Sequence, residues 1–244
     1  YMTNYNDFFN GLFSGITTTI ICNPLDVIRT NKQLSNKIDY NFKFLYRGLK
    51  TSLITIPSFW SIYFGTYKIL KKYNNSNFSI FNGYLASNLA STITCPLWFI
   101  RQKNQVISNF NVIEFYKSNG IKVFYNTLFT TYLINSSFIV QMPLYEYLKK
   151  KEQLNKYLND SLKIIFITAF SKTIASIIFY PIDTIRTHRR NFNNMYIIDI
   201  INNLNSKPLN YYNGLSIYLF RSIPYHCITF CTFEFLNKLK YKKK

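Results

Sequence analysis

One pattern occurs three times along the 244 residues of this chain, and it constrains the possible fold more than any other feature. Each copy begins with proline, carries arginine five positions later and follows a stretch of mainly apolar and small residues. The copies are Pro24–Thr30, Pro96–Gln102 and Pro181–Thr187. A second motif follows each copy and opens another apolar stretch, at Tyr46–Gly48, Tyr125–Thr127 and Tyr212–Gly214. A repeat of this length predicts one supersecondary unit that is used three times.

The apolar stretches predict long helices. Glycine and proline number only seven each, so the chain has few residues that interrupt regular structure. A helix of about 20 residues covers the ~30 Å of a bilayer, and lipid favours helices because their backbone polar groups pair internally. We expect helices at 5–33, 48–72, 79–106, 127–151, 161–189 and 214–239, with room for short surface helices in the linkers 34–47, 107–126 and 190–213.

Hydropathy permits membrane-spanning helices without requiring them. The mean hydropathy is −0.04, but a helix that lines an aqueous cavity inside a bundle can span while one face stays polar. The predicted fold class is an all-α membrane protein with six transmembrane helices in three pseudo-symmetric hairpins around a central cavity. The chain is expected to form one domain, 1–244, with repeats at 5–72, 79–151 and 161–239.

The charge of the chain indicates an anionic partner. Lysine and arginine total 29 against 10 acidic residues, for a net charge of +19. Nucleic acid, anionic lipid and a small anionic solute all fit this excess. A nucleic-acid-binding face would gather the basic residues on one side, whereas here they lie at both ends of the expected helices, as in Lys149–Lys151 and 242–244. We therefore expect lipid and a small anion as partners, and no nucleic acid.

The sequence does not indicate an enzyme. It contains two histidines and four cysteines without metal-ligand spacing, and it lacks a nucleophile elbow, a zinc-protease motif and a phosphate-binding loop. We therefore expect no metal and no cofactor. The three prolines of the repeat, Pro24, Pro96 and Pro181, fall inside expected helices, where each removes one backbone hydrogen bond and kinks the helix.

With the proline–arginine segment repeated three times in register between about Asp7 and Lys240, and with two copies matching Pro-x-[Asp/Glu]-x-x-[Lys/Arg] in full, the sequence resembles the mitochondrial carrier family. The resemblance implies three helix pairs around a cavity, one solute site near the membrane midplane and alternating access. It also implies a monomeric multi-pass protein of the mitochondrial inner membrane with both termini in the intermembrane space.

The resemblance assigns a matrix gate to the proline–arginine segments. Asp26 and Arg29 lie three residues apart and share a helix face, and in the family each acid meets the base of a neighbouring helix, braced by glutamine. The matrix-gate residues implied here are Asp26, Arg29, Gln33, Arg101, Gln105, Asp183 and Arg186. Two positions depart from the pattern: Trp98 replaces the second acid, and Arg190 replaces the third glutamine. Two of three ion pairs are therefore expected.

The gate at the opposite end is predicted to be weaker. The family's pattern on the even helices leaves Lys71, Glu146, Lys149 and Glu234, because Lys68 stands where the first acid belongs. One good pair remains, Glu234 with Lys71. Since opening this gate breaks few ion pairs, we hypothesise that the resting protein favours the state that is open to the cytoplasmic side.

The resemblance places solute contacts at Thr55, Ile134, Asn135 and Arg221, which lie at equal depth on the even helices. Arg221 is interpreted as a ligand for an anionic group or as a partner for a backbone carbonyl freed by Pro224. Lys172 contacts solute, or it snorkels or braces a neighbour. A second contact point without arginine disfavours carboxylates. The predicted activity is nucleotide or deoxynucleotide exchange, with phosphate, a cofactor or a carboxylate as the alternative.

The starts of the even helices are candidates for lipid binding. Free N–H groups and the positive end of the helix dipole suit phosphate, and in the family these steps bind cardiolipin. The residues that match are Arg47, Gly48, Asn213 and Gly214, while Thr127 departs. A simple helix-start turn is the alternative interpretation. The family also has a small-residue motif on the odd helices, and Gly11 and Gly15 match it, which predicts close helix packing.

Overall fold

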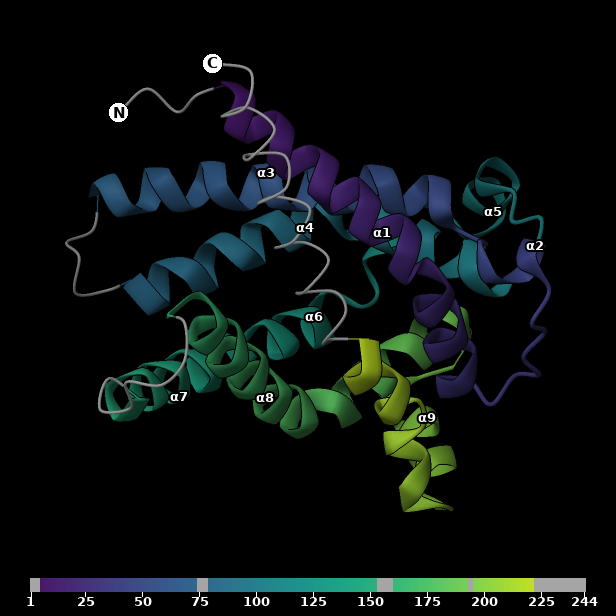
Figure 1. Cartoon of the computed structure of the whole chain (residues 1–244). Coiled ribbons are helices and arrows are strands. Elements are labelled where there is room, and N and C mark those ends of the chain that lie inside the picture. The colour runs from purple at the N-terminus through teal and green to yellow at the C-terminus, as the bar shows by residue number, and fades with distance from the viewer. Residues whose placement is uncertain (1–4, 74–78, 153–159, 193–194, 222–244) are drawn as a thin grey trace.

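The computed structural model describes residues 5–73, 79–152, 160–192 and 195–221 (Figure 1), and the described residues contain helices and no strand. The helices of the expected hairpins are α1 (Tyr5–Gln33), α3 (Leu49–Tyr73), α4 (Ser79–Val106), α6 (Leu128–Asn135), α7 (Ser137–Glu152) and α8 (Asp160–Asn191). The linkers hold α2 (Phe42–Leu45), α5 (Val112–Asn119) and α9 (Ile197–Asn205), with 3-10 turns η2 (Ile121–Tyr125) and η3 (Pro208–Tyr212). Residues 215–221 are also helical. The predicted all-α class is confirmed for this part of the chain.

The helix bounds follow the repeat closely, with one exception. α1 and α4 begin and end at the residues expected from the sequence. The helix expected at 127–151 is instead divided into α6 and α7 at Ser136. The Ser136 hydroxyl donates to the carbonyl oxygen of Leu133 at 2.5 Å, and the neighbouring Asn135 amide is engaged by another helix. The Ser136 hydroxyl competes with backbone N–H groups for the Leu133 carbonyl, and such a local bond favours an interruption here.

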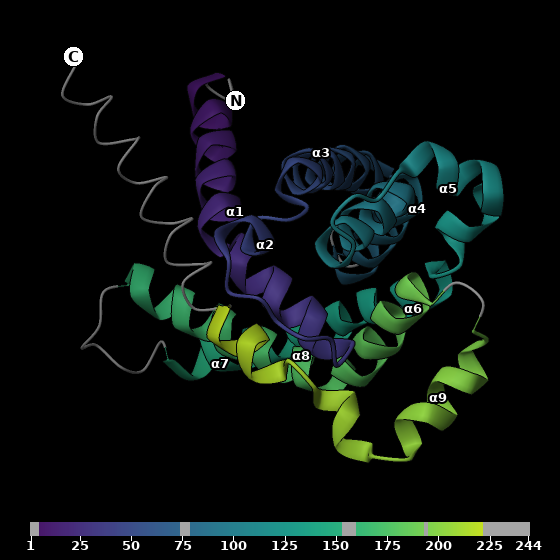
Figure 2. The same cartoon turned by 90° about the vertical axis from the view of Figure 1, so that its right-hand side faces the viewer.

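Neighbouring long helices pack as pairs. α3 lies beside α4, and α7 lies beside α8, in both views of the molecule (Figures 1 and 2). Pro24, Pro96 and Pro181 lie inside α1, α4 and α8, as expected, and Figure 2 shows α1 changing direction along its length. The segments that follow these prolines bring α1, α4 and α8 together at one end of the molecule.

The distribution of side chains is inverted relative to a water-soluble protein. Among the described residues, buried polar side chains outnumber buried apolar ones. Many large apolar side chains are more than half exposed, including Phe64, Ile93 and Ile178. Across the described helices, none is both long enough and apolar enough to qualify as a membrane span.

Two glycines shape the starts of the helices that follow the linkers. Gly48 and Gly214 have φ angles of 70° and 82°, a conformation that favours glycine. A Cβ atom on Gly214 would lie 3.1 Å from the carbonyl oxygen of Arg29 and 3.1 Å from the hydroxyl of Tyr180. The first residues of this helix therefore contact α1 and α8 closely. Around Gly15, by contrast, a Cβ would meet no described atom within 4 Å, so the close packing expected there is not seen among these residues.

We predict that Gly214→Ala destabilises the protein. The left-handed conformation costs alanine about 1–2 kcal/mol, which corresponds to a melting temperature lower by roughly 2–8 °C for a chain of this size. Thermal unfolding of the purified protein measures the shift. Gly65→Ala is the matched control, because Gly65 lies within α3 and a Cβ there meets nothing within 4 Å. Alanine favours the helix by ~1 kcal/mol, so a fall for Gly65→Ala as large as for Gly214→Ala would contradict the argument.

Candidate functional site

The junction between α1 and α8 is built on Asp183. Its carboxylate accepts hydrogen bonds from Arg29 of α1 and from Arg186 on its own helix. The side-chain N–H of Gln33 also donates to Asp183, at 3.1 Å. The Thr187 hydroxyl completes the junction by donating to the Gln33 side-chain oxygen at 2.9 Å. Two cations and two uncharged groups thus join the two helices around one acid.

The junction between α1 and α4 is built on Asp26. Arg101 of α4 donates to Asp26 at 2.9 Å and to the Ser52 hydroxyl at 2.8 Å. Arg221, the last described residue, forms a second ion pair with Asp26 at 2.6 Å. The Thr30 hydroxyl donates to the Gln105 side-chain oxygen at 3.0 Å. This junction therefore repeats the arrangement between α1 and α8, with one arginine contributed by another part of the chain.

Among the described residues, the junction between α4 and α8 has no acid. Trp98 occupies the position that Asp26 and Asp183 hold in the other repeats, and its ring lies 5.0 Å from the Arg101 guanidinium carbon. Arg190 joins the two helices instead, donating to the Gln102 side-chain oxygen at 3.2 Å. Arg190 also donates to the Thr127 hydroxyl at 3.1 Å. Within the described chain, this contact relies on hydrogen bonds between a cation and neutral groups.

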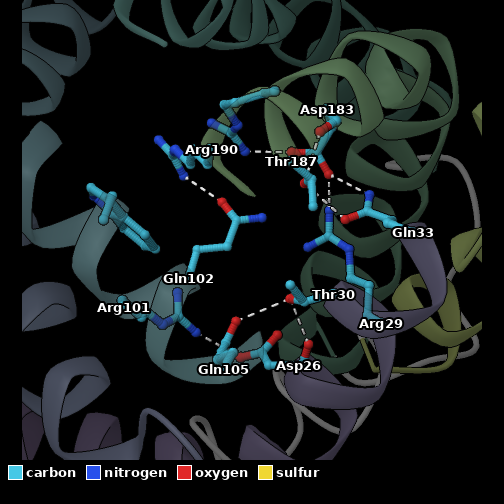
Figure 3. Close-up of a pocket in the computed structure, with 12 residues that line it drawn as sticks. Asp26, Arg29, Thr30, Gln33, Arg101, Gln102, Gln105, Asp183, Thr187 and Arg190 are labelled. Atoms are coloured by element: carbon cyan, nitrogen blue, oxygen red, sulfur yellow. Dashed lines mark hydrogen bonds and ion pairs between the residues drawn. The ribbon is translucent and has the colours of Figure 1, made fainter. Parts of the chain in front are cut away.

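These three junctions surround a cavity of about 80 Å³ (Figure 3). Its lining consists of Asp26, Arg29, Thr30, Gln33, Trp98, Arg101, Gln102, Gln105, Asp183, Arg186, Thr187 and Arg190. The lining includes four arginines and two aspartates, so its charge is positive. In a partly buried setting such charges attract anions more strongly than they do in water.

All seven matrix-gate residues predicted from the sequence line this cavity. Sequence reasoning missed Gln102 and the contact of Arg190. A signal was present, because Gln102 is equivalent in the repeat to Thr30 and Thr187. Each of these residues contacts the position four residues after the arginine on the next helix: Thr30 contacts Gln105, Gln102 contacts Arg190, and Thr187 contacts Gln33. Because each helix contacts the next one in the same cyclic order, the repeat predicts the contact between Gln102 and Arg190.

The predicted solute contacts lie outside the cavity lining. Thr55 is fully buried, and its hydroxyl donates to the Thr51 carbonyl at 2.7 Å. The Asn135 amide donates to the Asn88 side-chain oxygen at 2.9 Å and to the Ser91 hydroxyl at 3.0 Å. Ile134 and Lys172 are half-buried. Arg221 has the most informative position, because its ion pair with Asp26 connects a predicted solute contact to the α1–α4 junction.

The predicted cytoplasmic-gate residues are dispersed where they are described. Lys71, Glu146 and Lys149 are exposed, and no ion pair joins them within the described ranges. The Lys149 ammonium lies 5.9 Å from the centre of the Tyr145 ring. Glu234, like Pro224, lies outside the described residues. The end of the molecule with the α1–α4–α8 junctions thus carries ion pairs that the described part of the other end lacks.

The candidate lipid-binding residues lie at turns that begin helices. Arg47 donates to the Val106 carbonyl oxygen at 3.4 Å, and its guanidinium lies 4.6 Å from the centre of the Phe44 ring. Asn213 donates to the Asn210 side-chain oxygen at 3.4 Å. Gly48 and Gly214 provide the left-handed turns described above. These contacts match the helix-start turn of the alternative interpretation and leave lipid binding as a prediction.

Comparison with known proteins gives consistent similarities. A family model described as mitochondrial carrier protein matches residues 159–244. The chain is 28% identical to mitochondrial substrate carrier family protein W of Dictyostelium discoideum, over 93% of this chain and 84% of that protein. It is 24% identical to the mitochondrial FAD carrier protein FLX1 of Saccharomyces cerevisiae, over 93% and 94% of the two chains. It is 26% identical to the chloroplastic nicotinamide adenine dinucleotide transporter 1 of Arabidopsis thaliana, over 91% and 88%.

Proposed function

We propose that this chain is a member of the mitochondrial carrier family, whose members are transporters and not enzymes, and that it exchanges an anionic nucleotide or deoxynucleotide by alternating access. The ion pair between Arg221 and Asp26 is the observation that carries this proposal. A guanidinium group binds phosphate with two parallel hydrogen bonds. A solute phosphate that engages Arg221 would withdraw one of the two arginines from Asp26.

Competition for Arg221 supplies the coupling that a carrier needs. In this structure Asp26 holds Arg101 of α4 and Arg221 together. Once the solute takes Arg221, Asp26 keeps Arg101 alone, and the α1–α4 junction is weakened. A ligand shifts a conformational equilibrium only through its different affinity for the two states. Here the two states differ in whether Asp26 pairs with Arg221, and the anion binds Arg221 more tightly in the state in which that ion pair is broken.

A phosphorylated solute fits the site better than a simple carboxylate. The cavity lining and Arg221 together present five arginines against two aspartates, and such an excess suits a solute with several negative charges. The half-buried Ile134 and the adjacent amide of Asn135 offer an apolar surface and hydrogen bonds for a base. A dinucleotide cofactor is the second candidate, because two relatives are named as FAD and nicotinamide adenine dinucleotide transporters.

The proposal includes a location and a topology. Exposed apolar side chains such as Ile93 would face lipid, while the buried polar side chains would face the interior of the bundle. We infer six membrane-spanning segments in three pairs, within repeats 5–72, 79–151 and 161–239, in a monomer of the mitochondrial inner membrane. The end of the molecule where α1, α4 and α8 meet would be the matrix gate. Cardiolipin would bind near the helix starts at 47–48 and 213–214.

Uptake into proteoliposomes tests the solute class. Vesicles preloaded with unlabelled nucleotide are expected to take up labelled nucleotide or deoxynucleotide at least about tenfold faster than vesicles without internal solute, because an exchanger needs a counter-substrate. FAD and nicotinamide adenine dinucleotide test the second candidate in the same assay. Uptake restricted to inorganic phosphate or dicarboxylates would keep the carrier and refute the nucleotide proposal.

A further inference from the structure

The α4–α8 junction contains a buried cation without a carboxylate in the described structure. Arg190 is only 4% exposed. Its described side-chain partners are the uncharged Thr127 and Gln102. Burying a charge is costly unless another charge or several hydrogen bonds compensate it. An anion that enters the cavity would supply further compensation for the charge of Arg190.

The two aspartates of the cavity already form ion pairs with other arginines. Asp183 accepts from Arg29 and Arg186, and Asp26 from Arg101 and Arg221. Each acid therefore has two arginines. Trp98 removes the acid that the repeat pattern places on α4, so the positive charge is concentrated at the α4–α8 junction.

We propose that this cavity binds an oxyanion of the phosphate type against Arg190, between α4 and α8. Planar guanidinium groups match the oxygens of phosphate in geometry as well as charge. Figure 3 shows the Gln102 side chain extended into the cavity, with its oxygen on Arg190 and its amide nitrogen directed towards the centre. The amide can therefore donate to the same anion. The volume of about 80 Å³ has room for several water molecules or one such ion.

Arg190 and Gln102 line the cavity and Arg221 does not, and binding of phosphate at Arg190 does not depend on which solute is transported. Two sources would supply such a phosphate: a free inorganic ion, or the phosphate group of a nucleotide that reaches the cavity between α1, α4 and α8. Both sources present the same oxygens to Arg190, and binding measurements with each probe separate them.

Thermal unfolding of the purified full-length protein tests the site without a transport assay. Inorganic phosphate, compared with chloride at equal ionic strength, is expected to raise the melting temperature by roughly 5–10 °C at 100 times its Kd. Gln102→Glu places a carboxylate where the amide oxygen already contacts Arg190. This variant should melt higher than the wild type without phosphate and should lose the response to phosphate.

Two arginine variants complete the experiment. Arg190→Gln restores the glutamine of the other repeats and should also abolish the response. Arg189→Gln is the matched control with the same change in charge: Arg189 lies outside the cavity lining and donates to the Asn126 carbonyl at 3.0 Å. It should keep the full response. Gln102→Glu keeps the test decisive if Arg190→Gln does not fold.

The possible results separate clearly. Stabilisation by inorganic phosphate that Gln102→Glu abolishes identifies a site for the free ion. Stabilisation by a nucleotide alone, lost in the same variant, identifies the phosphate group of the solute. An unchanged response in Gln102→Glu and Arg190→Gln, or no response of the wild type to either probe, would overturn the proposal.

Discussion

Asp183→Asn is expected to lower the melting temperature by roughly 6–20 °C and to abolish uptake. Of the residues that the structure describes, Asp183 is the one acid at the α1–α8 junction, where Arg29 and Arg186 both donate to it. Removing one partner of a buried ion pair costs about 3–5 kcal/mol, because the other charge stays buried without compensation. In a chain of this size each kcal/mol corresponds to about 2–4 °C.

A second substitution shows whether the uncompensated charge of the arginines causes the fall in melting temperature. In Asp183→Asn combined with Arg29→Gln, one of the two uncompensated cations is removed, so the double variant should melt higher than Asp183→Asn alone. Asp39→Asn is the matched control, since Asp39 is exposed in the linker before α2, and its melting temperature should change little. An Asp183→Asn protein that melts with the wild type would exclude an energetic role for this junction.

Arg221→Gln is expected to reduce nucleotide uptake by about 30-fold or more. Truncating one partner of a buried, hydrogen-bonded charge pair costs about 2–5 kcal/mol in binding, and Arg221 is proposed both to bind the solute and to release Asp26. Stability should fall less than in Asp183→Asn, because Asp26 keeps its 2.9 Å contact with Arg101. Initial rates of uptake in proteoliposomes measure the effect.

The controls distinguish charge from geometry. Arg189→Gln removes the same charge near the junction but should transport normally. Arg221→Lys keeps the charge and loses the paired donors, so it should recover only part of the activity. Uptake by Arg221→Gln at the wild-type rate would show that the arginine does not contact the solute, while leaving the family assignment intact.

The repeat explains which features the sequence could predict. Helices α1 and α4 match the expected bounds because three aligned copies mark the same boundaries. Each acid was predicted to meet the base of a neighbouring helix, because residues on one face of each helix converge where three helices surround one axis, and Arg101 is the base that Asp26 meets. The interruption at Ser136 was not predicted, since the local bond of its hydroxyl to the Leu133 carbonyl is seen only in the structure.

The pairing of Arg221 with Asp26 also required the structure. Sequence spacing gives the depth of Arg221 along its helix, but its contact depends on the rotation of that helix against α1. The contact between Arg190 and Gln102 is an intermediate case. The repeat shows that both positions face the junction, and only the three-dimensional arrangement shows that two departures from the pattern, Thr127 and Arg190, touch each other.

Trp98 and Arg190 line the cavity where α4 meets α8, and Arg190 also donates to Thr127, so the end of the molecule where α1, α4 and α8 meet has two contacts with ion pairs and one without. The contacts at α1 are held by ion pairs, whereas the third contact has only uncharged partners for its arginine in the described structure. We therefore expect this end to open asymmetrically, with one contact between helices breaking before the other two. α4 and α8 would separate first, while α1 keeps its ion pairs with both helices. The exit for a solute would then lie off the pseudo-threefold axis.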